Sequence, residues 1–463
     1  MAKKDDKAKK SGKKSGDKDW KAIAKDLRKK LDRLKEAQAS DGVEAAPAKK
    51  KAIAISPLAP AAFPEMPQIE GVEFAAAAAG VRYKGRTDVM LARLAPGTAI
   101  AGAFTRSSTR AACVLDCQAK LSDKVSKDGA AILVNSGNAN AFTGSAGLES
   151  VARITEAVGR RLGVPASRVF TSSTGVIGEP LPHDRIIEAL DALEDGLDPG
   201  GIVDAARAIM TTDTFPKGAS AEIETPTGTI RIAGIAKGSG MIAPDMATML
   251  VYIFTDAKIS PALLQKIVSR QVDDSFNCIT VDSDTSTSDA LIMAATGTSR
   301  ADELKGLRSL EVQAFEAALR GVMMDLAHQV VKDGEGATKF VEVRVSGART
   351  PEDAHRVAMA IANSPLVKTA VAGEDANWGR VVMAVGKSGA HAERDLLSIR
   401  FGDILVAEKG WRSPDYSEEQ TSAYMKNDEL VIAVDLGLGS CERTVWTCDL
   451  THAYIDINAD YRS

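Results

Sequence analysis

Residues 237–250 form a glycine-rich segment between two apolar runs. They read Lys237-Gly238-Ser239-Gly240-Met241-Ile242-Ala243-Pro244-Asp245-Met246-Ala247-Thr248-Met249-Leu250. The runs on either side, 229–235 and 249–254, consist mainly of β-branched, aromatic and other apolar residues, which favour strands. Glycine and proline between such runs are typical of loops. The segment therefore predicts a loop joining two strands, with polar residues that are candidates for a functional site.

Two familiar kinds of site match this loop only in part. Gly238-Ser239-Gly240 could hold an anion with backbone N–H groups, but neither a complete nucleotide-binding glycine pattern nor a following helix is present. Ser239 lies between glycines, as an exposed nucleophile would. The Gly-x-Ser-x-Gly pattern is nevertheless absent, because position 237 is Lys, and no His–Asp partner is evident.

A third interpretation makes Thr248 a nucleophile that self-cleavage exposes. A Thr hydroxyl needs an adjacent base. Cleavage between Ala247 and Thr248 would supply one, because the new α-amine has a pKa of about 7.7–8.0. The alternative is that Thr248 only begins a buried strand. The local residues leave both interpretations open.

Charge divides the 463-residue chain into a basic tail and an acidic body. The whole chain has 58 Lys and Arg against 62 Asp and Glu, a net charge of −4. Residues 1–51 have 18 against 9, a net of +9, which leaves 40 against 53, or −13, for the remainder. We expect residues 1–68 to be a disordered tail with an amphipathic helix over 18–37 and an Ala/Pro linker over 38–68. The helix could instead dock on a partner, a membrane surface or nucleic acid, which would make the protein a non-catalytic binding or scaffold protein.

Composition excludes several classes of protein. No apolar run approaches 18 residues, so we expect no membrane span, and no secretory signal is present. Five cysteines without a Cys-x-x-Cys pair indicate a reduced, cytoplasmic protein. The five histidines lack metal-binding spacing, so we expect no metal site.

The body alternates strand-like and helix-like segments, which predicts a layered α/β or α+β fold. Expected strands are 132–135, 169–171, 229–235, 249–254, 340–345, 397–406 and 430–434. Expected helices are 147–163, 184–194, 201–211, 260–273, 303–331 and 351–363. Ser260 before Pro261 and Thr350 before Pro351 are candidate N-caps.

Six blocks from about residue 70 to the C-terminus resemble, in order, the ornithine acetyltransferases, which are the glutamate N-acetyltransferases of the cyclic arginine pathway. Besides the segment around Thr248, the blocks are 135–144, 171–178, 211–217, 333–339, 373–380 and 457–463. Residues 1–68 lie outside the resemblance.

The resemblance implies a role for each matching residue. Thr248 would be the nucleophile of a ping-pong acetyl transfer from N2-acetyl-L-ornithine to L-glutamate. Thr174 and Gly175 would stabilise the oxyanion, since a Thr hydroxyl and a Gly N–H are both donors. Substrate contacts are implied at Thr211, Lys237, Thr248, Glu335, Asn458 and Ser463. Ser463 stands where the family often has Thr, which keeps the hydroxyl and loses a methyl group.

The resemblance also implies an αββα sandwich with the layering of N-terminal-nucleophile hydrolases but different connectivity. The precursor would divide into an α chain, with its enzyme part at 69–247, and a β chain, 248–463, which pair as α2β2. No cofactor, membrane or nucleic acid is implied, and acetyl-CoA is a possible co-substrate. The alternative enzyme class is an N-terminal-nucleophile amidohydrolase or aminopeptidase, which would pass the acyl group to water.

Overall fold

The computed structural model describes residues 25, 28–30, 54–122, 126–243 and 249–459. Residues 1–53 and 54–463 form two separate units. In the first unit Lys25 and 28–30 are helical and exposed; the rest of the helix expected over 18–37 lies outside the described residues. None of the described helices is both long enough and apolar enough to cross a membrane.

The first sheet of the second unit has four strands in the order β1-β2-β4-β5. Their bounds are β1 Val72–Ala77, β2 Val89–Leu94, β4 Ala130–Asn138 and β5 Val169–Val176. β4 and β5 run parallel, because α3 (Gly144–Leu162) connects them as a crossover helix. With α4 (His183–Glu188) and α5 (Leu190–Asp195), α3 packs on the outer face of this sheet around Leu133 and Ile154.

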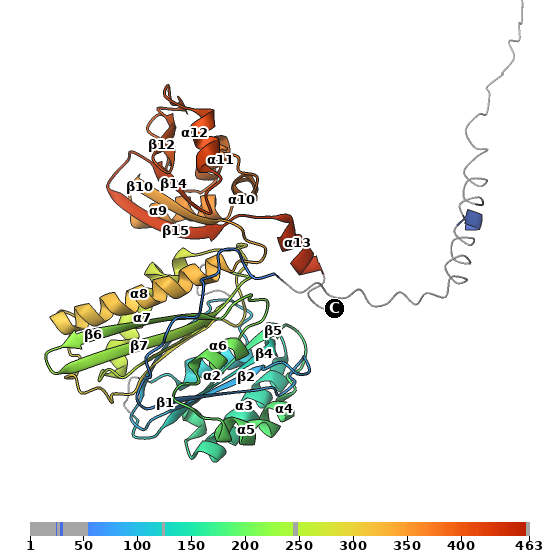
Figure 1. Ribbon diagram of the computed structural model, residues 1–463, viewed down its shortest axis with the longest axis vertical. Coiled ribbons are helices and arrows are strands. Elements are labelled where there is room, and N and C mark those ends of the chain that lie inside the picture. Colours follow the sequence, from blue (N-terminus) through green and yellow to red (C-terminus); the bar gives the residue numbers. More distant parts are fainter. Residues whose placement is uncertain (1–24, 26–27, 31–53, 123–125, 244–248, 460–463) are drawn as a thin grey trace, which may run out of the picture. The chain divides into compact units, whose positions relative to one another are not determined.

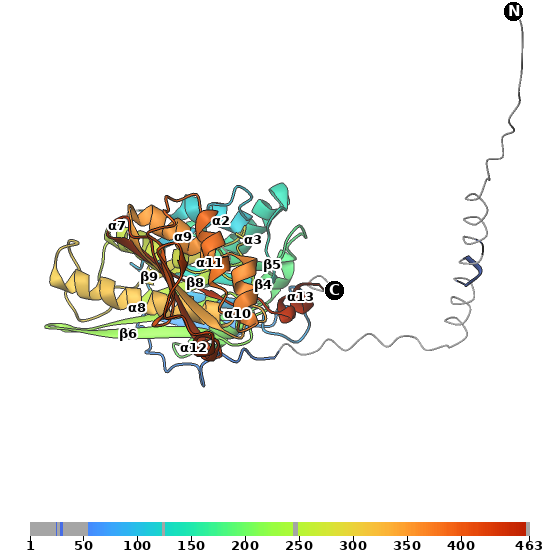
Figure 2. The same cartoon turned by 90° about the horizontal axis from the view of Figure 1, so that it is seen from above.

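The second sheet has five strands in the order β3-β9-β8-β7-β6. Their bounds are β3 Ala99–Phe104, β6 Lys217–Thr225, β7 Gly228–Lys237, β8 Leu250–Thr255 and β9 Ala290–Ala295. The helices α7 (Pro261–Asp274) and α8 (Leu310–Lys332) cover its outer face (Figures 1 and 2). Strands β8 and β9, which follow residue 248, therefore lie between β3 and β7, which precede it.

The inner faces of the two sheets pack against each other. Phe74 from β1 meets Phe254 from β8 edge to face, with ring centroids 4.9 Å apart. Ile132 from the first sheet and Tyr252 from the second lie fully buried in the same core. The layer order is helices, sheet, sheet, helices. The predicted αββα sandwich is confirmed, and two short helices, α2 (Ala112–Lys120) and α6 (Ile202–Ala208), pack at its edges.

The C-terminal part contains a third sheet, of which the sequence predicted only three strands, 340–345, 397–406 and 430–434. Its strand order is β13-β12-β11-β14-β10-β15. The bounds are β10 Phe340–Ala348, β11 Ser398–Phe401, β12 Ile404–Glu408, β13 Trp411–Arg412, β14 Glu429–Asp435 and β15 Cys441–Cys448. The accompanying helices are α9 Pro351–Ala362, α10 Pro365–Ala372, α11 Trp378–Gly386, α12 Glu418–Tyr424 and α13 His452–Ala459. Trp446 packs against both this core and the core beneath α8, and so joins the two.

The compact unit begins earlier than the linker expected over 38–68 would suggest. Leu58 packs against the core under α8, and Phe63 and Met66 pack against the core between the two sheets. Ser56 donates its N–H to the Thr214 hydroxyl at 3.0 Å. The second half of the expected linker is therefore part of the compact second unit.

Candidate active site

A cavity of about 370 Å³ opens where β5 and β7 end, between the two sheets of the sandwich and α13. Six predicted site residues line it, although they come from positions as distant in sequence as 174 and 458. They are Thr174, Gly175, Thr211, Lys237, Glu335 and Asn458. The remaining walls are Ala139, Val176, Ile177, Thr212, Gly240, Met241 and the Ser286–Ser288 loop. All the predicted site residues that the structure describes are thus together in one cavity.

Thr174 and Gly175 form one wall at the end of β5. Gly175 has φ of +133°, and a Cβ there would lie 2.3 Å from the carbonyl carbon of Gly137 on β4. Only glycine fits this close approach between the two strands. The parallel register is irregular at this point, where Asn138 pairs with both Thr174 and Val176. Thr174 itself is nearly buried, with 7% of its surface exposed.

Amide side chains in the last residues of β4 hold this wall in place. Ser173 donates its hydroxyl to Asn135 Oδ1 at 2.7 Å, and Asn135 Nδ2 donates to the Asn138 carbonyl at 2.9 Å. Asn138 Oδ1 in turn accepts the N–H of Asn140 at 2.8 Å. These side chains satisfy backbone groups of a buried loop, so their role is structural.

Lys237, the last residue of β7, supplies the cation of the cavity. Its Nζ donates to Thr211 Oγ1 at 3.3 Å, and only 4% of the residue is exposed. Burial lowers the pKa of Lys237 below its usual value, while the nearby carboxylates of Asp213, Asp289 and Glu335 oppose that change. A lysine held in this way is suited to pair with a carboxylate of a ligand.

Glu335 supplies the carboxylate of the cavity. Its Oε2 accepts a hydrogen bond from Asn458 Nδ2 on α13 at 2.6 Å. Burial raises the pKa of Glu335 above its usual value, although hydrogen bonds from Asn458 and Thr212 act in the opposite direction. Among the described residues, the cavity therefore offers one cation and one carboxylate, as recognition of a zwitterionic amino acid requires.

The two other interpretations of the glycine-rich loop fit the structure poorly. The Ser239 hydroxyl donates to the Asp333 carbonyl at 2.6 Å and the residue is 2% exposed, so it serves to hold the loop. A Cβ on Gly240 would lie 2.5 Å from the carboxylate of Glu335. A carboxylate packed so closely against the loop disfavours a phosphate at this position.

Thr248, Ala247 and Ser463 lie outside the described residues. The described residues that follow Thr248, Met249 and Leu250, lie in the second sheet. Leu250, the first residue of β8, pairs with Lys237, and the buried Met249 accepts the Ala290 N–H through its carbonyl at 3.2 Å. The chain therefore returns to the sheet directly beside Lys237.

Sequence reasoning missed two parts of the site. Asp282 accepts the N–H groups of Met241 and Ile242 at 2.6 and 2.9 Å, and Met241 has φ of +58°. The Ser286–Ser288 loop contributes hydroxyl groups to the wall. The only sequence signal for either was a Ser/Thr/Asp-rich run at 282–289, which is equally typical of an exposed loop.

Comparison with known proteins identifies the family. A sequence model described as the ArgJ family matches residues 73–463. The arginine biosynthesis bifunctional protein ArgJ of Ruegeria pomeroyi is 66% identical over 410 residues, covering 88% of this chain and 98% of that protein. The chain belongs to the ArgJ family. The predicted family is confirmed, and the matched range contains every predicted site residue.

Other ArgJ relatives give the same result at greater distance. The protein of the same name from Gluconobacter oxydans is 52% identical over 413 residues, covering 89% of this chain and 96% of that protein. A crystal structure of an ornithine acetyltransferase from Mycobacterium tuberculosis, complexed with ornithine, is 34% identical; it covers 39% of this chain and 93% of that chain, with a TM-score of 0.34. The matches to the two ArgJ proteins leave the first fifty residues of this chain largely outside the family.

Proposed function

We propose that this protein transfers an acetyl group from N2-acetyl-L-ornithine to L-glutamate by a ping-pong mechanism. One observation carries the proposal: six residues that match the family's site, dispersed from 174 to 458, line a single cavity that contains one lysine and one glutamate. The names of its ArgJ relatives, which place them in arginine biosynthesis, support it.

The first half-reaction moves the acetyl group onto the enzyme. The Thr248 hydroxyl attacks the acetyl carbonyl, and the α-amine of Thr248 takes the hydroxyl proton. The C–N bond to ornithine then breaks, the same proton passes to the leaving nitrogen, and ornithine departs. An ester on Thr248 remains. Glutamate enters, its amine attacks the ester, and Thr248 recovers its proton as N-acetylglutamate leaves.

Thr174 and Gly175 would stabilise the negative oxygen that forms in both half-reactions. Both line the cavity, and a hydroxyl and a backbone N–H are the donors that such an intermediate needs. The enforced backbone geometry of Gly175 supports this assignment, because donors held rigidly in place need no reorganisation during the reaction.

Lys237 and Glu335 would orient both substrates through the groups they share. Acetylornithine and glutamate each have an α-carboxylate and an α-nitrogen, so one cavity with a cation and a carboxylate can bind the two in turn. Thr211 and Asn458 would complete the contacts, because each is hydrogen-bonded to one of these charged residues. Ser463 would add a hydroxyl from the C-terminus.

The nucleophile would be released by self-cleavage. The Thr248 hydroxyl attacks the Ala247 carbonyl, the peptide C–N bond breaks to give an ester, and water hydrolyses that ester. The products are an α chain ending at Ala247 and a β chain beginning at Thr248, which we propose assemble as α2β2. The reaction needs no metal or other cofactor, and acetyl-CoA would enter only as an alternative acetyl donor, as the name "bifunctional" of the relatives suggests.

Intact-mass analysis of the purified protein tests cleavage and chemistry together. We expect two chains divided after Ala247. When the protein is incubated with acetylornithine alone and then quenched, the β chain should be one acetyl group heavier. Adding glutamate should remove the extra mass and yield N-acetylglutamate. T248A should stay as one inactive chain, and T248S is the matched variant that keeps a hydroxyl.

Three outcomes would contradict the proposal or part of it. An uncleaved chain that still transfers acetyl groups would exclude Thr248 as an exposed N-terminal nucleophile. Free acetate formed at the same rate with and without glutamate would favour the amidohydrolase class. Failure to acetylate glutamate from acetyl-CoA, with transfer from acetylornithine intact, would restrict the protein to a single activity.

A further inference from the structure

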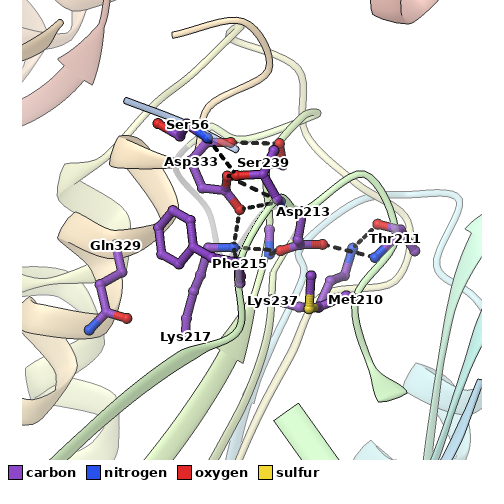
Figure 3. A network of polar contacts seen from close by, with 12 residues as sticks. Ser56, Met210, Thr211, Asp213, Phe215, Lys217, Lys237, Ser239, Gln329 and Asp333 are labelled. Carbon is purple, nitrogen blue, oxygen red and sulfur yellow. Dashed lines mark hydrogen bonds and ion pairs between the residues drawn. The ribbon is translucent and has the colours of Figure 1, made fainter. Parts of the chain in front are cut away.

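A fully buried ionic cluster lies close to Lys237 (Figure 3). Lys217, the first residue of β6, donates from Nζ to Asp213 Oδ1 at 2.7 Å and to Asp333 Oδ2 at 2.5 Å. None of the three side chains has any exposed surface. Burying charges is costly even when they are paired, so such a cluster is weak evidence for a purely stabilising role.

Asp213 connects this cluster to Thr211 and Lys237, which form one wall of the cavity. Its Oδ2 accepts the backbone N–H of Thr211 at 2.9 Å, and its Oδ1 accepts the N–H of Gly238 at 2.7 Å. Gly238 directly follows Lys237, and the side chains of Lys237 and Thr211 are themselves hydrogen-bonded. One carboxylate therefore holds the backbone of both Thr211 and Gly238, on the wall that carries the Lys237 cation.

Asp333 extends the same cluster toward Glu335. Its carboxylate accepts hydrogen bonds from the Thr214 N–H and hydroxyl, and its carbonyl accepts the Ser239 hydroxyl at 2.6 Å. The carbonyl of Ser239 in turn accepts the N–H of Glu335 at 3.0 Å. The cluster thus reaches the backbone of both charged residues of the cavity.

We propose that Asp213, supported by Lys217 and Asp333, is a positioning residue that fixes the Lys237 ammonium group against Thr211 for binding of the substrate carboxylate. The proposal rests on the proposed function, in which Lys237 binds both substrates. Asp213 would act only through Lys237 and Thr211, because it does not line the cavity.

The charges around Lys237 give Asp213 a second effect, on proton binding. The groups that face Lys237 are Asp213 before β6, Asp289 before β9, Glu335 after α8 and the cation of Lys217 on β6. Burial lowers the pKa of Lys237, and Asp213 is the strongest of the opposing carboxylates. Replacing Asp213 by neutral Asn should therefore make Lys237 lose its proton at lower pH.

The experiment compares D213N with a matched control, D256N. Asp256 is also a buried carboxylate that accepts a backbone N–H of β7, from Arg231 at 2.8 Å. Arg231 lies six residues before Lys237, about 20 Å along the strand. Both full-length proteins would be measured for kcat/KM against pH, and for the pH at which Lys237 becomes reactive toward dinitrofluorobenzene, read by mass spectrometry.

In D213N we expect the Lys237 labelling midpoint and the basic limb of kcat/KM to move to lower pH by about one unit. In D256N we expect neither to move. An unchanged labelling midpoint in a folded D213N would overturn the electrostatic part of the proposal. Labelling of Lys237 does not depend on turnover. If the wild-type protein transfers no acetyl group, the proposed function is refuted, but the labelling midpoints still test the effect of Asp213 on Lys237.

D213E separates position from charge. Glu keeps the negative charge and displaces it by one methylene, so we expect the labelling midpoint to stay and kcat/KM to fall at least tenfold, mainly through KM. Wild-type KM and kcat in D213E would overturn the positioning role. This variant also decides the question if D213N does not fold.

Discussion

Gly175 is the residue at which the fold and the proposed chemistry constrain each other most tightly. The proposed oxyanion site uses the Gly175 N–H, and the neighbouring strand leaves no room for a Cβ at this residue. G175A should therefore destabilise the protein by roughly 3 kcal/mol or more. The backbone around the new Cβ has to move, and the alanine has to adopt an unfavourable φ. It should also reduce kcat by up to about 10²–10³, because the displaced backbone N–H can no longer donate to the oxyanion as proposed.

Gly178 provides the control for this prediction. It also has a positive φ, +84°, but nothing lies within 4 Å of the place where its Cβ would be. G178A should cost only about 1 kcal/mol and leave kcat nearly unchanged. Thermal unfolding and steady-state rates of the two variants measure both effects. Equal losses in the two would mean that the contact with Gly137 is unimportant.

Glu335 should contribute to function at the expense of stability. Its folded-state pKa is raised by burial, so its contribution to stability is fully present below the ordinary Glu pKa of about 4.3 and is lost as pH rises through the folded-state value. E335Q should therefore be more stable than the wild type at pH 7, and this advantage should shrink as pH falls through the folded-state pKa and disappear below about 4.

Substrate binding by E335Q should show the opposite change. Losing the charge of the carboxylate that we propose accepts the N–H of the substrate's α-nitrogen should lower kcat/KM about 10- to 100-fold. Urea unfolding between pH 4 and 8 gives the stability profile. E429Q is the control, since Glu429 forms an exposed pair with Lys332 that should contribute less than about 1 kcal/mol. A neutral-pH loss of stability in E335Q would contradict this account.

At the scale of single residues, sequence reasoning identified the members of the site through resemblance rather than through local chemistry. Lys237 and Glu335 are ordinary residues in sequence, and only the fold brings them to one cavity. Asp213 and Asp282 were not predicted at all, because their role is to bind backbone N–H groups of other segments. No spacing rule marks such long-range contacts.

Among the elements, the caps were predicted well. The Ser260 and Thr350 side chains accept the N–H groups of Leu263 and Asp353, with proline at the start of both helices, as expected. S260A should destabilise the protein by about 1 kcal/mol and S260D should restore most of it, with activity unchanged in both. Denaturant unfolding measures the difference; a large loss of activity in S260A would show that α7 affects the cavity.

Strands of small residues escaped prediction. β1 reads Val-Glu-Phe-Ala-Ala-Ala and β3 reads Ala-Ile-Ala-Gly-Ala-Phe, compositions with little intrinsic strand preference. Both form strands because the sandwich supplies a neighbouring strand for each, β2 for β1 and β9 for β3. Packing here overrides local preference. The helix expected over 303–331 begins only at Leu310, since Gly306 has φ of +72° and Ser309 is the N-cap.

For the whole molecule, the boundary of the compact unit gives a prediction about truncation. A chain that begins at residue 54 should keep the stability and activity of the full protein, because it retains every contact of the described enzyme body. A chain that begins at residue 69 should lose roughly 3 kcal/mol, since Leu58, Phe63 and Met66 leave apolar cores. Thermal unfolding of the two truncated chains distinguishes the two boundaries. Equal stability of both chains would support the boundary at residue 69 that was expected from sequence.

The position of β8 and β9 between β3 and β7 affects how the protein refolds before and after cleavage. In the uncut precursor all four strands belong to one chain, so they find one another at a high effective concentration. If the chain is cut after Ala247 as proposed, that advantage is lost, while the assembled sheet persists behind its unfolding barrier. A cut molecule that unfolds must then reassemble from two pieces, each with unpaired strand edges that invite aggregation. Refolding of the cut protein should therefore depend on its concentration, and refolding of T248A should not.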